Sequence, residues 1–172
     1  MKKQIILFAL ISVFSLVFIA CDKDEDSNLI SGNVDLYLLK SFETVENTAQ
    51  IDSSTVITNE NPLIRYSDFV SYDSENYIFK ISENMEQSIK NMEFPVSGVA
   101  FAIKANNNLI YTGYFWPGYS SASCNWVVID PIILFNELRV RLGGQIQGTN
   151  IPDNRNDERI LNIFRRDNKL IE

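Results

Sequence analysis

Alternation of apolar and polar residues marks several strands along the chain. Val34, Leu36 and Leu38 occupy alternate positions, which is the period of a strand with one buried face. Two apolar, β-prone runs at 98–105 and 109–116 are separated by three asparagines. Asparagine tolerates the left-handed backbone of tight turns, so the sequence predicts a β-hairpin here. Further strands are expected at 55–58, 77–81, 126–129 and 138–142.

Two segments have the pattern of amphipathic helices. The segment 83–92 places apolar residues at i, i+4 and i+7 on one helical face, and Ser82 precedes it as a cap. The segment 156–167 has acidic residues in its first turn and arginines in its last, which complements the helix dipole. Together these elements predict an α+β fold, with a mainly antiparallel sheet of about five to six strands and two helices packed on one face.

The beginning of the chain has the pattern of an export signal. Two lysines precede an apolar run over 5–19, which is shorter than the about 20 residues that a membrane-spanning helix needs. A small alanine and Cys21 end this run. The arrangement resembles bacterial lipoprotein signals, in which this cysteine becomes the lipidated first residue of the mature protein. The expected division is a signal peptide at 1–20, a lipidated cysteine and tether at 21–32, and one globular domain at 33–172.

The residues that follow Cys21 are mostly polar and acidic, which is typical of a flexible tether. Among them, Lys23, Asp24 and Glu25 resemble the signal that directs lipoproteins of Bacteroidota to the cell surface. The alternative interpretation is a solvated spacer without a sorting role. The resemblance implies a lipid-anchored protein of the cell envelope, at the outer membrane and exposed on the surface.

Charge and composition exclude several classes of function. The formal net charge is −7, and an acidic body repels phosphate backbones, so nucleic-acid binding is not expected. The chain contains no histidine, which excludes Ser-His-Asp and Cys-His catalysis and zinc sites with histidine ligands. If Cys21 carries lipid, Cys124 has no intramolecular partner, because these are the only two cysteines. Because the domain is acidic, membrane contact is expected through the lipid on Cys21 and not through a basic surface.

An aromatic stretch at 111–126 is the most distinctive segment of the domain. Trp116, Tyr119 and Trp126 are candidates for a ligand-binding platform, because aromatic rings stack on the apolar faces of sugars and present polar tips to hydroxyl groups. The alternative interpretation is that rings at strand spacing fill the core. Trp116 and Tyr119 lie beyond the expected end of the strand, where a loop can expose them.

Other candidate chemistry is weaker. Cys124 has neither a base nor a cation beside it in the sequence, so a small buried thiol is the simpler interpretation. A pairing of Ser120 with Lys104 as nucleophile and base has no distinguishing spacing. The segment 153–158 resembles a calcium loop, but an arginine stands at the third position and the required glycine is missing, so helix capping explains it better. No metal site and no cofactor are predicted.

A pair of carboxylates facing across a cleft is the remaining route to catalysis, since glycosidases use such a pair. The acidic residues Asp68, Asp73, Glu75 and Glu83 are possible members. Spacing in the sequence does not bring any two of them together. Solvated loop charges are the alternative interpretation for all four.

Two runs carry a family resemblance that covers roughly residues 63–168. The run Ile-Tyr-Thr-Gly-Tyr-Phe-Trp at 110–116 and the closing Asp-Asn-Arg-Asn-Asp at 153–157 are similar to those of a group of small envelope lipoproteins of the Bacteroidota type. The strand-helix-strand unit over 77–105 also resembles, in topology, the periplasmic head of the SecDF translocation factors. These resemblances imply an α+β fold and bring no known active site.

The leading hypothesis is therefore a lipid-anchored, non-catalytic binding module for an envelope or extracellular component, either a protein or a glycan. Two alternatives remain open. One is a glycan-active enzyme that uses paired carboxylates, and the other is a structural or assembly subunit of an envelope complex, which would need an exposed apolar patch.

Overall fold

The computed structural model describes residues 32–132, 135–144 and 150–172, and within these ranges the fold is α+β, as predicted. Nine strands of the described chain form one sheet, so the expected number of five to six was too low. The strands are β1 (Val34–Ser41), β2 (Ile57–Thr58), β3 (Phe69–Asp73), β4 (Ile78–Ile81), β5 (Val99–Ala105), β6 (Asn108–Phe115), β7 (Val127–Ile129), β8 (Glu137–Leu142) and β9 (Leu170–Ile171).

The order of strands across the sheet is β2-β1-β5-β6-β7-β8-β4-β3-β9. Most neighbours are antiparallel, but β6 and β7 run parallel, as do β3 and β9. The predicted hairpin is confirmed as β5 and β6, with Ala105 opposite Asn108. Asn106 and Asn107 make its turn with φ of 53° and 64°, the left-handed backbone for which asparagine was expected there.

The prediction did not include β3 and β9. Val70, in the middle of β3, is exposed beside a buried phenylalanine, and Ser71 follows it, so the strand shows little apolar alternation. β9 has two residues, which are too few to carry any period, and it forms only by pairing Leu170 with Tyr72 far away in the sequence. Pairing between distant segments of this kind leaves little local signal.

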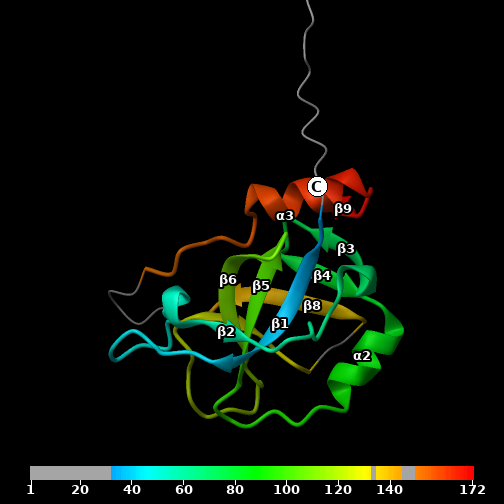
Figure 1. Ribbon diagram of the computed structural model, residues 1–172. Helices are drawn as coiled ribbons and strands as arrows, with labels where there is room; N and C mark the ends of the chain where they lie inside the picture. Colours follow the sequence, from blue (N-terminus) through cyan, green and yellow to red (C-terminus); the bar gives the residue numbers. More distant parts are fainter. Residues whose placement is uncertain (1–31, 133–134, 145–149) are drawn as a thin grey trace, which may run out of the picture.

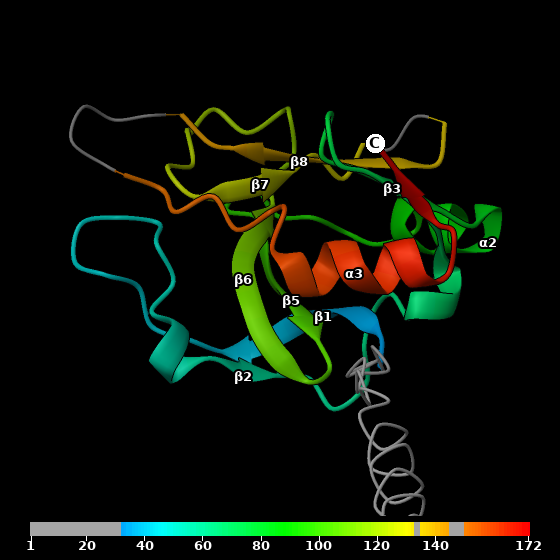
Figure 2. The same ribbon diagram turned by 90° about the horizontal axis from the view of Figure 1, so that it is seen from above.

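Both predicted helices are present, as α2 (Glu83–Lys90) and α3 (Glu158–Arg166). The Ser82 side chain accepts a hydrogen bond from the backbone N–H of Met85, and Asp157 caps α3 in the same way through the N–H of Arg159. Figure 1 shows α3 across the top of the sheet and α2 at the lower right, away from α3. Ile89 of α2 and Phe164 of α3 nevertheless belong to the same buried core, and the sheet curves so that strands lie on either side of α3 (Figure 2).

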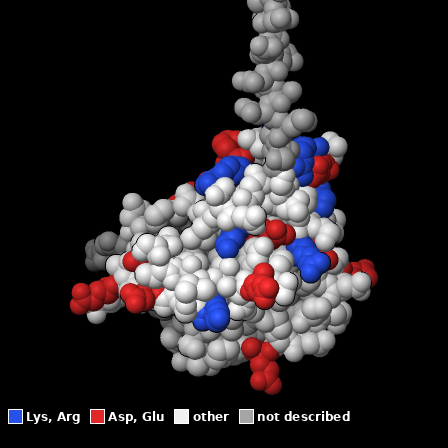
Figure 3. All heavy atoms as spheres, in the orientation of Figure 1, with Lys and Arg blue, Asp and Glu red and all other residues white. Residues whose placement is uncertain are grey.

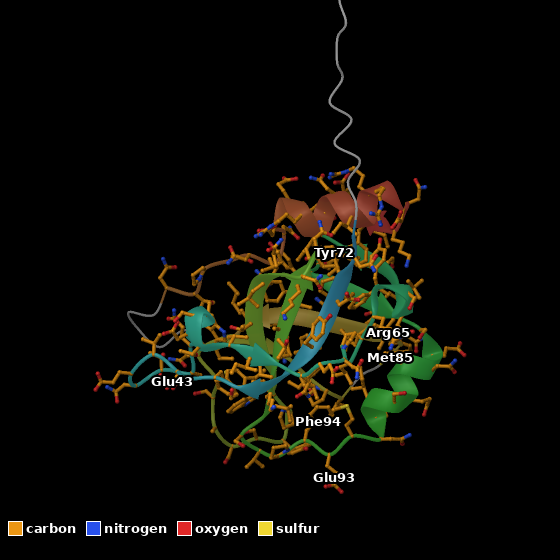
Figure 4. The ribbon with its side chains drawn as sticks, in the orientation of Figure 1. Glu43, Arg65, Tyr72, Met85, Glu93 and Phe94 are labelled. Carbon is orange, nitrogen blue, oxygen red and sulfur yellow. The ribbon has the colours of Figure 1, made fainter. Side chains whose placement is uncertain are left out.

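An aromatic cluster forms the core beneath α3. The ring of Phe164 lies 5.3 Å from that of Tyr66 and 5.6 Å from that of Tyr72, measured between centroids, and all three side chains are buried. Figure 4 shows Tyr72 directly below α3. Phe69 and Phe79 complete the cluster, with centroids 6.0 and 5.8 Å from Phe164. α3 is thus held mainly by aromatic burial against the concave side of the sheet.

A buried arginine fixes the segment that leads into α3. The Nε and Nη2 groups of Arg155 donate to the carboxylate of Asp153, and its Nη1 group donates to the backbone carbonyl of Val140. The guanidinium also lies 3.5 Å from the centre of the Tyr77 ring. The Tyr72 hydroxyl donates to the backbone carbonyl of Arg155, so β3, β8 and the residue just before β4 all contact this segment. The acidic segment at 153–158 therefore serves helix capping and packing, as expected.

No helix within the described ranges is long and apolar enough to cross a membrane. Figure 3 shows acidic and basic side chains interspersed on the face drawn, with basic ones near α3 next to acidic ones. This arrangement agrees with the ion pairs of α3, where Arg159 pairs with Asp157 and Arg165 with Glu172.

Candidate functional site

The residues expected to anchor and sort the protein, Cys21 and Lys23, Asp24 and Glu25, lie outside the described residues. The structure therefore bears on the three aromatic candidates of the domain. It places Trp116, Tyr119 and Trp126 in three different environments.

Trp126 belongs to the core. Its side chain is buried, and its Nε1 group donates to the Thr112 hydroxyl at 3.1 Å. A ring enclosed in this way offers no stacking surface to a large ligand, so we leave Trp126 out of the candidate site. Its spacing in the sequence did not reveal this, because it precedes β7 directly and faces Thr112 on the neighbouring parallel strand.

Trp116 follows β6 and lines a hollow of about 260 Å³, here called the Trp116 hollow. Its Nε1 group donates to the backbone carbonyl of Ala122, so the ring is held in place by the loop that follows. Gly98 packs against the ring, and a Cβ atom there would lie 2.8 Å from Cε3 of Trp116. The Arg141 side chain lines the same hollow. An indole ring and a guanidinium thus meet at one surface depression.

Tyr119 lies on the same loop and is 60% exposed. It lines a hollow of about 280 Å³, the Tyr119 hollow, whose other lining residues are Ile89, Lys90, Met92, Phe94, Pro131 and Ile132. The Tyr119 hydroxyl donates to the backbone carbonyl of Phe94 at 2.6 Å, and the Ser120 hydroxyl donates to that of Val96 at 2.7 Å. These bonds tie the loop after β6 to the loop after α2, so the wall of the hollow is held in place.

Between these two lies a third depression of about 320 Å³ on the outer side of β8, here called the arginine hollow. Its lining residues are Asp130, Ile132, Phe135, Glu137, Arg139 and Arg141. Phe135 is 83% exposed and Ile132 is 57% exposed. The side chains of Arg139 and Arg141 point to the same face, since they stand two positions apart on one strand.

The three hollows form one continuous surface. Arg141 lines both the Trp116 hollow and the arginine hollow, and Ile132 lines both the arginine hollow and the Tyr119 hollow. We call this the loop-end surface. Figures 1 and 4 show Phe94, at its Tyr119 end, opposite α3 and opposite the point where β1 begins. Three shallow depressions in a row suit an extended chain better than a compact small molecule.

The loop-end surface does not assemble a nucleophile. Cys124 lines the Trp116 hollow but is buried, and burial raises the pKa of its thiol, which disfavours the reactive thiolate. The Ser120 hydroxyl is bound to the Val96 carbonyl, while the ammonium of Lys104 donates to the Thr58 hydroxyl on another part of the sheet. The structure therefore does not pair Ser120 with Lys104.

The carboxylates nominated from the sequence have local roles. Asp68 accepts a hydrogen bond from the backbone N–H of Arg65, and Asp73 accepts from both the backbone and the side chain of Asn76. None of the four lines the loop-end surface. The two carboxylates that do meet in one hollow are Asp130 and Glu137, which the sequence did not single out. Among the described residues no group of three potential ligand side chains could hold a metal ion.

One signal for the arginine hollow is present in the sequence. The run at 131–135 is apolar at all five positions, although it lies between two strands where polar turn residues are usual. The alternating arginines of β8 had been assigned only to a half-exposed strand. The apolar run at 131–135 and the arginines that follow it on β8 together indicate an exposed surface of mixed character.

Comparison of the chain with protein-family models, with curated proteins and with solved structures found no match.

Proposed function

We propose that this protein is a lipid-anchored lipoprotein of the outer membrane, exposed at the cell surface, whose domain is a non-catalytic binding module for an envelope or extracellular component. The observation that carries the proposal is the loop-end surface, where exposed apolar side chains line connected hollows. Ile132 and Phe135 are each more than half exposed, and soluble domains keep large apolar side chains on the surface in groups mainly where they contact a partner.

The position of this surface supports the anchoring part of the proposal. The described chain enters the domain at β1, beside α3, where Arg166 donates to the Gly32 carbonyl, and Phe94 lies at the opposite end (Figures 1 and 4). A lipid on Cys21 would hold the β1 end toward the membrane through the short tether. The Tyr119 hollow would then face away from the membrane, where a partner can reach it.

The anchor is tested by Cys21→Ser in the full chain, followed by membrane fractionation and metabolic labelling with palmitate. We expect the variant to lose the label and to leave the membrane fraction, because the acyl chains on Cys21 are the proposed anchor. Cys124→Ser is the matched control and should stay membrane-bound. A Cys21→Ser protein that still sediments with membranes would exclude the lipid anchor. Replacement of Lys23, Asp24 and Glu25 by alanine should abolish cleavage of the protein by protease added to intact cells.

The binding role is tested by replacing exposed apolar residues of the loop-end surface. The probes are detergent-extracted outer-membrane proteins and purified cell-surface polysaccharide, presented to the purified full chain. We expect Ile132→Ser with Phe135→Ser to abolish retention of the ligand. The control is Val70→Ser, which removes a residue of similar exposure, 50%, from β3. Retention that is equal in both variants would contradict a role for this surface.

The polysaccharide arm also tests the aromatic residues. If a glycan is the ligand, Trp116→Ala and Tyr119→Ala should each weaken binding, since the stacking of a sugar on an aromatic ring contributes to such affinity. Glycan binding that survives both substitutions would remove the aromatic platform from the proposal.

A second candidate function, a glycan-active enzyme, is favoured by one observation: Asp130 and Glu137 line the same hollow. Paired carboxylates across a sugar-binding site are the machinery of most glycosidases. The test is the release of reducing ends from cell-surface polysaccharide by the full chain. Release that Glu137→Gln abolishes would establish the enzyme and replace the non-catalytic proposal.

A further inference from the structure

Arg139 and Arg141 present two guanidinium groups that no carboxylate of the described chain neutralises directly. Neither makes an ion pair or a hydrogen bond within the described residues. Directly across from them stand Ile78 of β4 and Val128 of β7, which carry no charge. Arg139 lies near enough to Asp73 to contribute to the lowered pKa of that carboxyl, but as the weakest of its causes.

Four of the other five described arginines differ from this pair, and only Arg65 likewise makes no ion pair. Arg155, Arg159, Arg165 and Arg166 each bind a carboxylate close by in the sequence. Solvent exposure does not explain the difference, because the side chains of Arg159 and Arg165 are also about half exposed and still paired. A guanidinium has a planar, forked donor set that fits a carboxylate. The pair on β8 therefore offers two such donor sets to a group from outside the chain.

The two carboxylates of the arginine hollow, Asp130 and Glu137, form no ion pair with either arginine. Oδ1 of Asp130 accepts a hydrogen bond from the backbone N–H of Ile132 at 3.0 Å, and Gly118 packs against its Oδ2 atom. Glu137 stands directly opposite Lys80 of β4, the position at which opposite charges in neighbouring strands interact. The guanidinium groups of Arg139 and Arg141 are thus not paired with the two carboxylates that share their hollow.

The apolar neighbours indicate what kind of chain carries the matching negative charge. The Tyr119 hollow is lined almost entirely by aliphatic and aromatic side chains, which suit an apolar side chain of a polypeptide. A sugar there would lose water from its hydroxyl groups without gaining hydrogen bonds from aliphatic walls. Phe135 extends this apolar character to the edge of the arginine hollow.

We infer that the ligand of the loop-end surface is an extended segment of a partner protein that carries both acidic and large apolar side chains. Its carboxylates pair with Arg139 and Arg141, and its apolar side chains enter the Tyr119 hollow and cover Ile132 and Phe135. The inference rests on the proposed function, since it names the partner of the same surface. It also accounts for the arginines, which an apolar binding surface alone does not require.

The experiment uses the full chain, immobilised in detergent micelles, against a displayed library of random dodecapeptides. We expect selected peptides to be enriched in both Asp or Glu and Leu, Ile or Phe. The affinity of one selected peptide, measured by fluorescence anisotropy, should fall about ten-fold in the double variant Arg139→Gln and Arg141→Gln. Binding to the unchanged protein should weaken as salt is raised, and this salt dependence should largely disappear in the double variant.

The matched control is Arg159→Gln with Arg165→Gln, which removes the same charge from α3. This pair should leave both affinity and salt dependence unchanged. Selected peptides that are apolar but not acidic would overturn the inference and leave the binding module standing. Binding of polygalacturonate, an acidic glycan, in place of any peptide would overturn it in favour of a sugar ligand. Failure of peptides and glycan alike to bind would count against the inference and the proposed function together.

Discussion

Removal of the Arg155 guanidinium should destabilise the domain far more than removal of the equivalent group from Arg159. The two residues have the same local geometry, because each binds the aspartate two positions before it through Nε and Nη2. They differ in surroundings. The side chain of Arg155 is 10% exposed and that of Arg159 is 50% exposed. Only Arg155 also contacts the Val140 carbonyl and the Tyr77 ring.

The size of this effect can be worked out for substitution by methionine, which keeps most of the apolar stem of arginine and removes the charged group. In Arg155→Met a buried backbone carbonyl loses its donor, which costs about 1–3 kcal/mol, and a cation–π contact worth about 1–2 kcal/mol is lost. We therefore expect a loss of about 3 kcal/mol in the free energy of unfolding. In Arg159→Met only an exposed ion pair is lost, so the expected cost is about 0.5 kcal/mol.

The assay is a urea titration of the full chain carrying Cys21→Ser, followed by the fluorescence of its two tryptophans. A loss of 3 kcal/mol should lower the midpoint by about 1.5–2 M urea, while the Arg159 variant should shift by a few tenths. Asp153→Asn is a further control and should cost much less than Arg155→Met, because it leaves the other contacts of the arginine in place. Equal midpoints for the Arg155 and Arg159 variants would refute the argument that burial decides the value of these pairs.

Three further predictions concern the core and its ionisable groups. Gly113→Ala should cost about 1–3 kcal/mol in the same titration, since its Cβ would lie 2.6 Å from Cζ of Phe101, and an unchanged midpoint would disprove this packing. Cys124, which is buried, should react with a thiol reagent only as fast as the domain opens, and rapid labelling of the native protein would contradict that burial. Stability should be flat between about pH 5 and 8, because the chain has no histidine. Stability should fall below about pH 4. The hydrogen bond from Arg155 lowers the pKa of the Asp153 carboxyl in the folded protein, so acid protonates this carboxyl first in the unfolded chain and favours that state. Stability should fall again above about pH 10, where unfolded tyrosines ionise while burial raises the pKa of Tyr114 to about 12; a titration of the unfolding midpoint against pH checks both limits.

Much of the fold was predictable because its signals are local. The asparagine turn between β5 and β6, the cap at Ser82 and the charged ends of α3 each depend on a few adjacent residues. β9 and the curvature of the sheet were not predictable in this way. They arise from pairing and packing between segments about 100 residues apart, such as the contact of the Tyr66 hydroxyl with the Ile163 carbonyl.

In the candidate site, too, features with a local signal were predictable and features that depend on distant segments were not. Tyr119 could be nominated because a loop position after a strand is commonly exposed. The burial of Trp126 could not be predicted from its neighbours in the sequence, since it depends on packing beside the adjacent parallel strand, where its Nε1 group donates to Thr112. Arg139 and Arg141 were visible as alternating residues of a strand, but their lack of partners depends on which residues of β4 and β7 lie opposite.

The place of α3 in the chain has a consequence for the order in which the protein is made. The aromatic residues that Phe164 covers belong to segments synthesised about 85 to 100 residues earlier. A growing chain that ends before residue 158 has nothing to close over them, so the domain can complete its fold only after α3 has been synthesised. During all of that time the polypeptide stays open to chaperones. A step that requires an unfolded thread, such as passage through a narrow membrane pore, has this interval in which to begin.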